Sequence, residues 1–190
     1  MGRRLNDHEL LLELARRDFA VYFQLMFSLL EPQTELKWNW HHDYLAGVFD
    51  AFRRGDLRRV NLNMPVRHLK SQFVSIALVT YWLGLDPTKR FMCVSYGQDL
   101  SDSFSAQRRR VMNSPLYRSL FPGTRLTKGQ QSLGYMTTTA GGAILSTSVG
   151  GAITGFGADV ILFDDVLKPE EAQSNVQRNR VNGWAPHVST

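Results

Sequence analysis

The sequence predicts an α/β fold in which a mainly parallel sheet carries helices on both faces. Segments with helical periodicity alternate with short apolar runs along the chain, for example at residues 90–96 and 159–163. These runs are too continuously apolar for strands with one face in water, which is typical of a parallel sheet covered on both sides. Ligands of such sheets bind at the carboxyl ends of the strands.

Length and composition agree with one globular domain. The chain has 190 residues, of which 43% are hydrophobic and 21% charged. Its net charge of +5 suits either a solvated basic surface or an anionic partner such as a nucleotide or a nucleic acid. The single cysteine, Cys93, excludes an internal disulfide and indicates a reducing, intracellular compartment. The longest apolar runs, residues 19–30 and 73–85, are shorter than the ~20 residues of a membrane span.

The elements can be predicted in order from periodicity, caps and breakers. Asn6 or Asp7 can cap the first helix, and prolines and glycines end several of the others. We expect an N-terminal helical region, residues 1–54, and a core domain, residues 55–190. In chain order the predicted elements are a helix over residues 8–30 with a break near residues 17–18, a helix over 37–52 that ends at 55–56, a strand at 60–64, a helix at 71–83, a strand at 90–96, a helix at 101–113, a short helix or turn at 115–122, a hairpin of 135–139 and 143–148, a strand at 159–163 and a helix over 169–184.

The loop after the predicted strand at residues 60–64 has the layout of a phosphate-binding loop. It ends in Lys70 and Ser71, as the G-x-x-x-x-G-K-[ST] signature does, but Met64 and Leu69 occupy its two glycine positions. In such a loop the lysine contacts the phosphates and the serine hydroxyl holds Mg²⁺. The alternative is an ordinary helix start with Ser71 as its cap. The expected nucleotide-binding residues of the loop are Pro65, Val66, Arg67, His68, Leu69, Lys70, Ser71 and Gln72.

Two aspartates, Asp164 and Asp165, directly follow the apolar run at residues 160–163. The first carboxylate can organise Mg²⁺, which prefers oxygen ligands, and the second can polarise an attacking water as a general base. The alternative is a plain loop start, since aspartate favours turns. Together with Lys70 and Ser71, the pair favours an ATP-hydrolysing site that uses Mg²⁺. We expect Lys70 and Asp165 to be catalytic, and Ser71 and Asp164 to bind the metal.

Further polar and aromatic side chains flank the loop. Arg67 is a candidate catalytic residue that would stabilise charge developing on the γ-phosphate. Upstream, Trp40, His41 and His42 offer aromatic and hydrogen-bonding groups for a purine, although contacts within the core would explain them as well. Clusters of arginines are interpreted first as solvated faces and second as contacts to a DNA backbone; they lie at residues 53–54, 58–59 and 108–110.

An ordered set of short segments extends the pattern over most of the chain. The segments are Trp40-His41-His42, Gly55, residues 65–71, Ser95-Tyr96, residues 117–122, residues 151–157, Asp164-Asp165 and residues 168–174. With this set, the chain resembles the ATPase domain of the large subunit of tailed-phage terminases, the motors that package viral DNA.

The resemblance implies a P-loop NTPase fold of the additional-strand class that hydrolyses ATP with Mg²⁺ and drives double-stranded DNA into a procapsid. It also implies a ring of copies, a portal protein and a terminase small subunit as partners, no membrane, and the cytoplasm of a bacterial host. Carried over by position, Lys70 and Ser71 bind phosphate and Mg²⁺, and Arg67 matches the arginine of the loop. Asp164 supports Mg²⁺, and Asp165 occupies the position of the catalytic acidic residue.

Three features depart from the resemblance. Leu69 stands where relatives have a glycine, whose backbone freedom a leucine lacks, and we therefore expect weak nucleotide binding. Phe156 stands where relatives often have an arginine. The chain ends at Thr190, before the implied nuclease domain, so we expect a core domain that is incomplete at its C-terminus. The alternatives are a degenerate, non-hydrolysing P-loop fragment that binds DNA or partner subunits, and a helicase-like ATPase.

Overall fold

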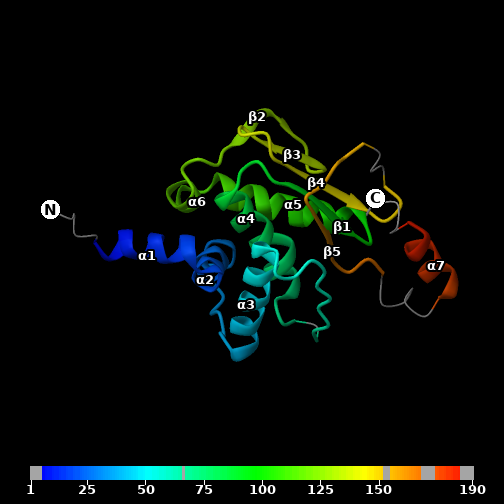
Figure 1. Cartoon of the computed structure of the whole chain (residues 1–190), viewed down its shortest axis with the longest axis horizontal. Helices are drawn as coiled ribbons and strands as arrows, with labels where there is room; N and C mark the ends of the chain where they lie inside the picture. Colours follow the sequence, from blue (N-terminus) through cyan, green and yellow to red (C-terminus); the bar gives the residue numbers. More distant parts are fainter. Residues whose placement is uncertain (1–5, 66, 152–154, 168–173, 185–190) are drawn as a thin grey trace.

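The computed structural model of the chain describes residues 6–65, 67–151, 155–167 and 174–184 (Figure 1). In chain order its elements are α1 (Asp7–Arg17), α2 (Phe19–Leu30), α3 (Trp40–Arg54), the π-helix η1 (Gln72–Leu78), α4 (Val79–Leu85), β1 (Arg90–Ser95), α5 (Gln98–Asn113), α6 (Pro115–Leu120), β2 (Leu126–Gln131), β3 (Tyr135–Thr138), β4 (Ala143–Ser148), β5 (Val160–Phe163) and α7 (Asn175–Trp184). No helix within these ranges is both long and apolar enough to cross a membrane.

The sheet has five strands in the order β2-β3-β4-β1-β5. β1 lies between β4 and β5 and runs parallel to both, so that Cys93 is level with Ser146 and Leu162. β3 is antiparallel to β4, which confirms the predicted hairpin, and β2 continues the sheet antiparallel to β3. The α/β class is therefore confirmed, but the sheet is mixed, and the predicted parallel arrangement holds for β4, β1 and β5.

The strand predicted at residues 60–64 is wrong. The described backbone there belongs to no strand of the sheet. Val60, Leu62 and Met64 are half-buried, while the two asparagines between them are exposed. Leu62 and Met64 pack against the core, so the alternation reflects one-sided packing of an unpaired segment. Asparagine is also depleted in strands, so the two asparagines make strand pairing here less favourable than the apolar alternation suggested.

Local capping signals set the boundaries of the N-terminal helices. Asn6 and Glu9 form a capping box at the start of α1. The predicted break is confirmed at Asp18, which ends α1 and whose side chain accepts hydrogen bonds from the first N–H groups of α2. Gly55 ends α3 in the left-handed conformation with φ of 85°, which a glycine adopts without the penalty of a side chain.

The helix predicted at residues 71–83 is present, but it has two parts. Its first part is the π-helix η1, and regular α-helical geometry begins at Val79 in α4. Nothing in the apolar spacing of this segment distinguishes the two geometries. π-Helical turns are rare and frequently lie at functional sites, so η1 marks this part of the fold for closer inspection.

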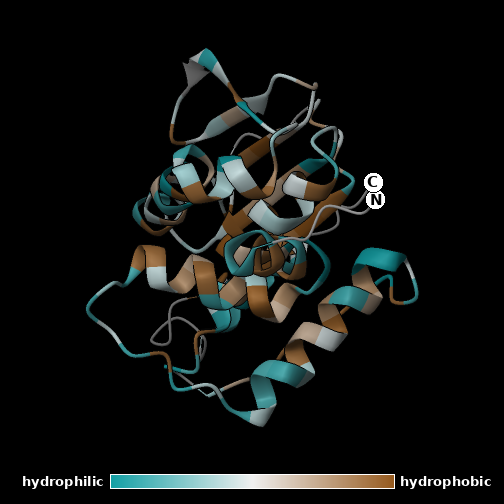
Figure 2. Cartoon of the chain, turned by 90° about the vertical axis from the view of Figure 1, so that its left-hand side faces the viewer, coloured by the Kyte–Doolittle hydropathy of each residue, from teal (hydrophilic) through white to brown (hydrophobic). Residues whose placement is uncertain are grey.

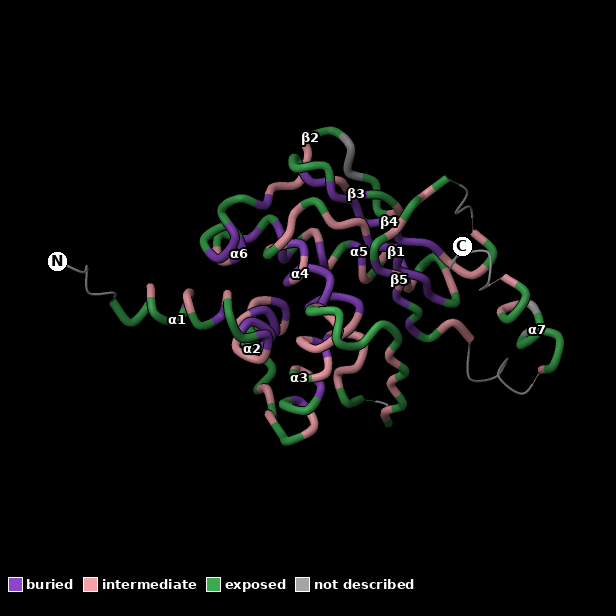
Figure 3. The backbone as a smooth tube through the Cα atoms, in the orientation of Figure 1, coloured by how far each residue is buried: buried purple, intermediate pink, exposed green. Residues whose placement is uncertain are grey.

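The two faces of the sheet are covered differently. On one face, Phe91 and Cys93 of β1 join a large core with α2, α3, η1, α4, α5 and α6, which appears as the buried centre of Figure 3. On the other face, Met92 and Val94 pack with a smaller set of side chains from loops and with Trp184 of α7. Helices cover the first face densely, as predicted. On the second face, Trp184 is the only described side chain from a helix that packs with Met92 and Val94.

Phe73 lies at the centre of the first core, where the N-terminal helices meet η1. Its ring stacks on Phe23 with 3.7 Å between centroids and on His42 with 5.3 Å between centroids. In Figure 2 the hydrophobic segments gather in this interior, where the helices meet the sheet. Because α1, α2 and α3 share this core with the rest of the chain, the boundary between residues 54 and 55 stays a prediction.

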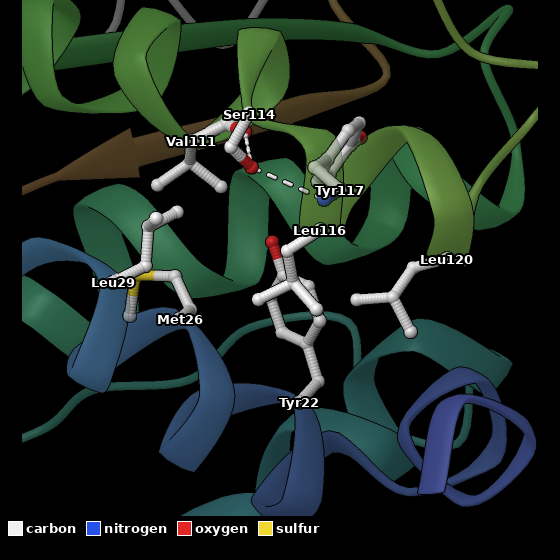
Figure 4. A pocket seen from close by; sticks show the side chains of 8 residues that line it. All are labelled: Tyr22, Met26, Leu29, Val111, Ser114, Leu116, Tyr117 and Leu120. Atoms are coloured by element: carbon white, nitrogen blue, oxygen red, sulfur yellow. Dashed lines mark hydrogen bonds between the residues drawn. The ribbon is translucent and has the colours of Figure 1, made fainter. Parts of the chain in front are cut away.

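A small void lies between α2, α5 and α6 (Figure 4). Its volume is about 10 Å³, which is the lower limit for a single water molecule. The void is too small for a ligand and is a gap in packing. Its lining residues are Tyr22, Met26, Leu29, Val111, Ser114, Leu116, Tyr117 and Leu120.

Candidate active site

Lys70 and the two aspartates that follow β5 form a compact charged cluster. The Nζ of Lys70 lies 2.5 Å from Oδ1 of Asp165 and 3.2 Å from Oδ1 of Asp164. Lys70 comes from the turn that leads into η1, and the aspartates emerge at the carboxyl end of β5. The structure therefore brings together the two motifs that the sequence analysis paired.

The two carboxylates differ in their surroundings. Asp164 is 3% exposed, its backbone N–H donates to Val94, and its Oδ2 accepts a hydrogen bond of 2.8 Å from the hydroxyl of Ser75. Asp165 is exposed to solvent, and its φ of 48° lies in the left-handed region that aspartate tolerates better than most residues. Asp164 is thus suited to hold a fixed position, and Asp165 is open to water.

The charge of Lys70 is reinforced by its partners. Burial lowers the pKa of the Lys70 ammonium, but the hydrogen bond to Asp165 and the charge of Asp164 raise it by more, so the net shift of the pKa is upward. The lysine is therefore fully charged at neutral pH. It acts in this structure as the cation that balances two adjacent carboxylates.

Two residues of the loop, Arg67 and Leu69, have left-handed backbone conformations. Arg67 has a φ of 63° and Leu69 a φ of 60°, whereas His68 and Lys70 are not among the residues of positive φ. Ser71 is right-handed, with φ of −67°. An alternation of left-handed and right-handed residues is a general way to turn successive N–H groups toward an anion. The signs of φ in this loop agree with such an alternation, although the loop contains no glycine.

Leu69 occupies this left-handed position at a cost. A residue with a side chain is strained there by roughly 1–2 kcal/mol, since its Cβ approaches the neighbouring carbonyl oxygen. The side chain of Leu69 packs against the core, and its carbonyl accepts a hydrogen bond from the N–H of Phe73. These contacts offset the strain and anchor the loop to η1.

The start of the helix after the loop does not use Ser71 as a cap. Lys70 and Ser71 lie at the start of a helix, as the alternative interpretation predicted, but the Ser71 side chain makes no capping hydrogen bond. Ser71 is half-buried. The side-chain amide of Gln72 donates to Gln107 of α5, which directs this predicted loop residue toward the neighbouring helix.

The histidines at the start of α3 lie beside the loop. The ring centroids of His41 and His68 are 5.5 Å apart, and those of His41 and His42 are 3.9 Å apart. His42 is buried, and its Nδ1 accepts a hydrogen bond from the backbone N–H of Asn39 as part of a capping box. Burial, followed by the charge of His41, lowers the pKa of His42. Of the predicted purine-contacting segment, Trp40 is exposed and His41 borders the loop, whereas His42 serves the core.

Fewer contacts define the remaining residues that were predicted for the nucleotide-binding loop. Pro65, Arg67 and His68 are exposed to solvent. Val66 lies outside the described residues. Arg67 makes no hydrogen bond or ion pair within the described part of the chain that would assign it a role.

The donor atoms near Lys70 suit Mg²⁺ better than a transition metal. Mg²⁺ is bound through one or two carboxylates and completes its shell with water and phosphate oxygens, and Asp164 and Ser71 offer oxygen donors of this kind. The ammonium of Lys70 already stands as a cation between two carboxylates. Within the described ranges, no group of three or more His, Cys, Asp or Glu side chains could hold a metal ion, so a closed protein cage of the zinc type is not found there.

Sequence reasoning missed two residues that support this cluster. Ser75 bonds to Asp164, and Arg108 bonds to Ser75. Arg108 was expected on a solvated or DNA-binding face, but it is 1% exposed, and Arg110 donates to the carbonyls of Leu29 and Leu30. The only available signal was the position of Arg108 in line with the buried Ser101, Ser105 and Met112 of α5.

In comparisons with known proteins, no protein-family model and no curated protein sequence matches the chain.

Proposed function

We propose that this chain is an Mg²⁺-dependent ATPase domain that couples ATP hydrolysis to the movement of double-stranded DNA, as in the large subunit of a terminase. The ATPase part is supported chiefly by one observation: Lys70 meets Asp164 and Asp165 beside a loop whose backbone alternates in φ. The DNA-translocating part, with a ring of copies, a portal protein and a small subunit, rests on the sequence resemblance and agrees with the net charge of +5.

Different residues bind different parts of a nucleoside triphosphate. The N–H groups of the loop and the ammonium of Lys70 bind the phosphate oxygens. Asp164 and Ser71 hold Mg²⁺, which when bound withdraws charge from the phosphates. His41 borders the loop and Trp40 is exposed, which supports contact of these side chains with the base, and Arg67 is exposed as well.

Asp165 accepts the proton in the hydrolytic step. A water oxygen forms a bond to the γ-phosphorus, the bond from that phosphorus to the bridging oxygen of the β-phosphate breaks, and one water proton passes to an Oδ of Asp165. The products are ADP and inorganic phosphate, and the proton then leaves Asp165 for solvent. Asp165 is exposed, so both water and solvent can reach it.

The ion pair of Lys70 and Asp165 must open before this step. In the unbound site, the Asp165 carboxylate accepts a hydrogen bond from the Lys70 ammonium. When Lys70 moves to the phosphates, this carboxylate loses that partner and its oxygen is open to a water molecule. Nucleotide binding therefore frees the base in the same movement that engages the lysine.

Leu69 favours a second candidate function. Its left-handed φ without glycine weakens the case for tight phosphate binding, and a domain that keeps the fold but does not hydrolyse ATP would have no need of a glycine there. Such a domain would bind DNA or partner subunits without turnover.

Titration with a fluorescent ATP analogue tests the proposed function. Lys70→Met removes the ammonium, and Lys89→Met is the matched control, which removes a lysine whose Nζ lies 3.8 Å from Asp86. We expect the unmodified chain and Lys89→Met to bind alike, and Lys70→Met to bind roughly 10- to 100-fold more weakly, as the loss of a charge-assisted hydrogen bond implies. Absence of binding by the unmodified chain, or equal binding by Lys70→Met, would overturn the proposal.

A further inference from the structure

A buried arginine connects three elements behind the candidate active site. Arg108 of α5 donates from Nη1 to the backbone carbonyl of Ser75 in η1, at 2.6 Å. It donates from Nη2 to the hydroxyl of Ser146 in β4, at 2.7 Å. The guanidinium thus lies between the helix that follows the loop and the strand next to β1, and Arg108 is buried.

Ser75 connects Arg108 to the acidic cluster of Asp164 and Asp165. Its hydroxyl donates to Oδ2 of Asp164, while Oδ1 of the same carboxylate faces Lys70. The two oxygens of Asp164 therefore have separate partners. One is bonded inside the fold, and the other is directed toward the place where a cation sits.

The burial of Arg108 needs a physical reason, because a buried guanidinium is costly unless it is paired and hydrogen-bonded. Its hydrogen-bond acceptors here are neutral oxygens, and its Nε has no hydrogen-bond partner among the described residues. The carboxylate reached through Ser75 is that of Asp164, which is itself buried. Ser75 joins the two buried groups, because its carbonyl accepts from Arg108 and its hydroxyl donates to Asp164.

We propose that Ser75 and Arg108 are positioning residues for Asp164: they keep its Oδ2 occupied and its Oδ1 turned outward, and in this way they set the affinity of the site for a divalent cation. This inference rests on the proposed function, since it concerns the metal that accompanies the nucleotide. Hydrogen-bonded partners behind a metal ligand fix its orientation, and their loss typically weakens metal binding about 10- to 100-fold.

A purely structural role for the network would have different consequences. If Ser75 and Arg108 only joined η1 to α5 and β4, their replacement would lower the free energy of unfolding and leave the metal affinity of the folded protein unchanged. Metal binding measured well below the unfolding temperature therefore separates the two roles.

Electron paramagnetic resonance with Mn²⁺ as the probe gives that measurement. Mn²⁺ is titrated into the protein saturated with a non-hydrolysable ATP analogue, for the unmodified chain and for Ser75→Ala. Ser101→Ala is the matched control, because Ser101 is a buried helical serine whose hydroxyl has no hydrogen-bond partner in the described structure. Ser75→Thr keeps the hydroxyl and tests for rescue.

We expect Ser75→Ala to bind Mn²⁺ about 10-fold more weakly or worse, and Ser101→Ala and Ser75→Thr to stay close to the unmodified chain. The affinity for the analogue in the presence of EDTA should change by less than about twofold, since the phosphate contacts are intact. Arg108→Lys, which keeps the charge but loses the fork of two donors, gives a second test and should shift Mn²⁺ affinity in the same direction.

Equal Mn²⁺ affinity in the unmodified chain, Ser75→Ala and Arg108→Lys, with the analogue bound, would overturn the positioning role and leave the proposed function in place. Failure of the unmodified chain to bind the analogue at all would instead overturn the proposed function, and the positioning role with it.

Discussion

The candidate active site has two halves that differ in burial and in the contacts that hold them in place. The acidic half is built around Asp164, which is buried and bonded to Ser75. The loop half, residues 67–71, is exposed at its first two residues, half-buried at the other three, and contains two left-handed residues. Lys70 is the side chain that joins the halves.

This difference indicates which half responds to a ligand. The acidic half has its orientation before any ligand arrives, because its hydrogen bonds come from the interior of the fold. In the loop half, the ammonium of Lys70 is engaged with carboxylates and must be transferred to phosphate. We therefore expect nucleotide binding to rearrange Lys70 and Asp165 and to leave Asp164 and Ser75 in place.

Leu69 tests the backbone of the loop half. Leu69→Gly removes the left-handed strain, worth roughly 1–2 kcal/mol, and should tighten the binding of fluorescent ATP by about tenfold if this strain opposes the bound form. Leu69→Ala keeps the strained Cβ but removes the bulk of the side chain, and should bind like the unmodified chain. Tighter binding by Leu69→Ala would show that crowding limits binding, and no gain in either variant would count against the loop as the phosphate site.

A smaller effect, on stability, distinguishes the histidines next to the loop. The pKa of His42 is lowered in the folded state, so the unfolded chain binds a proton more readily below about pH 6.5. The stability that depends on neutral His42 is present above that pH and is lost as the pH falls through the lowered pKa. His42→Gln keeps a capping-box side chain that does not titrate. In urea unfolding it should lose less stability between pH 7 and 5.5 than the unmodified chain does; an equal loss would assign the pH dependence to other groups.

Features with a local cause could be predicted from the sequence. The helix break at Asp18, the end of α3 at Gly55 and the hairpin of β3 and β4 each depend on residues within a few positions. The strain at Leu69 also followed from one missing glycine, and its φ of 60° agrees with that reasoning.

Features that depend on distant partners could not be predicted. The segment at residues 60–64 alternates like a strand but finds no pairing partner in the described sheet. Arg108 sits in an arginine triplet that is typical of a solvated face, and its burial depends on Ser75 and Ser146, which come from other elements. The same holds for Ser75, whose role appears only when Asp164 is brought beside it by the sheet.

Steady-state ATP turnover by Asp165→Asn tests the central claim most directly. Asp159→Asn is the matched control, because Asp159 lies at the opposite end of β5, where it accepts a hydrogen bond from the N–H of Arg90. The proposed site predicts that the unmodified chain and Asp159→Asn hydrolyse ATP alike, and that Asp165→Asn still binds fluorescent ATP but turns over about 10²- to 10⁴-fold more slowly. Turnover by Asp165→Asn at the rate of the unmodified chain would contradict the account.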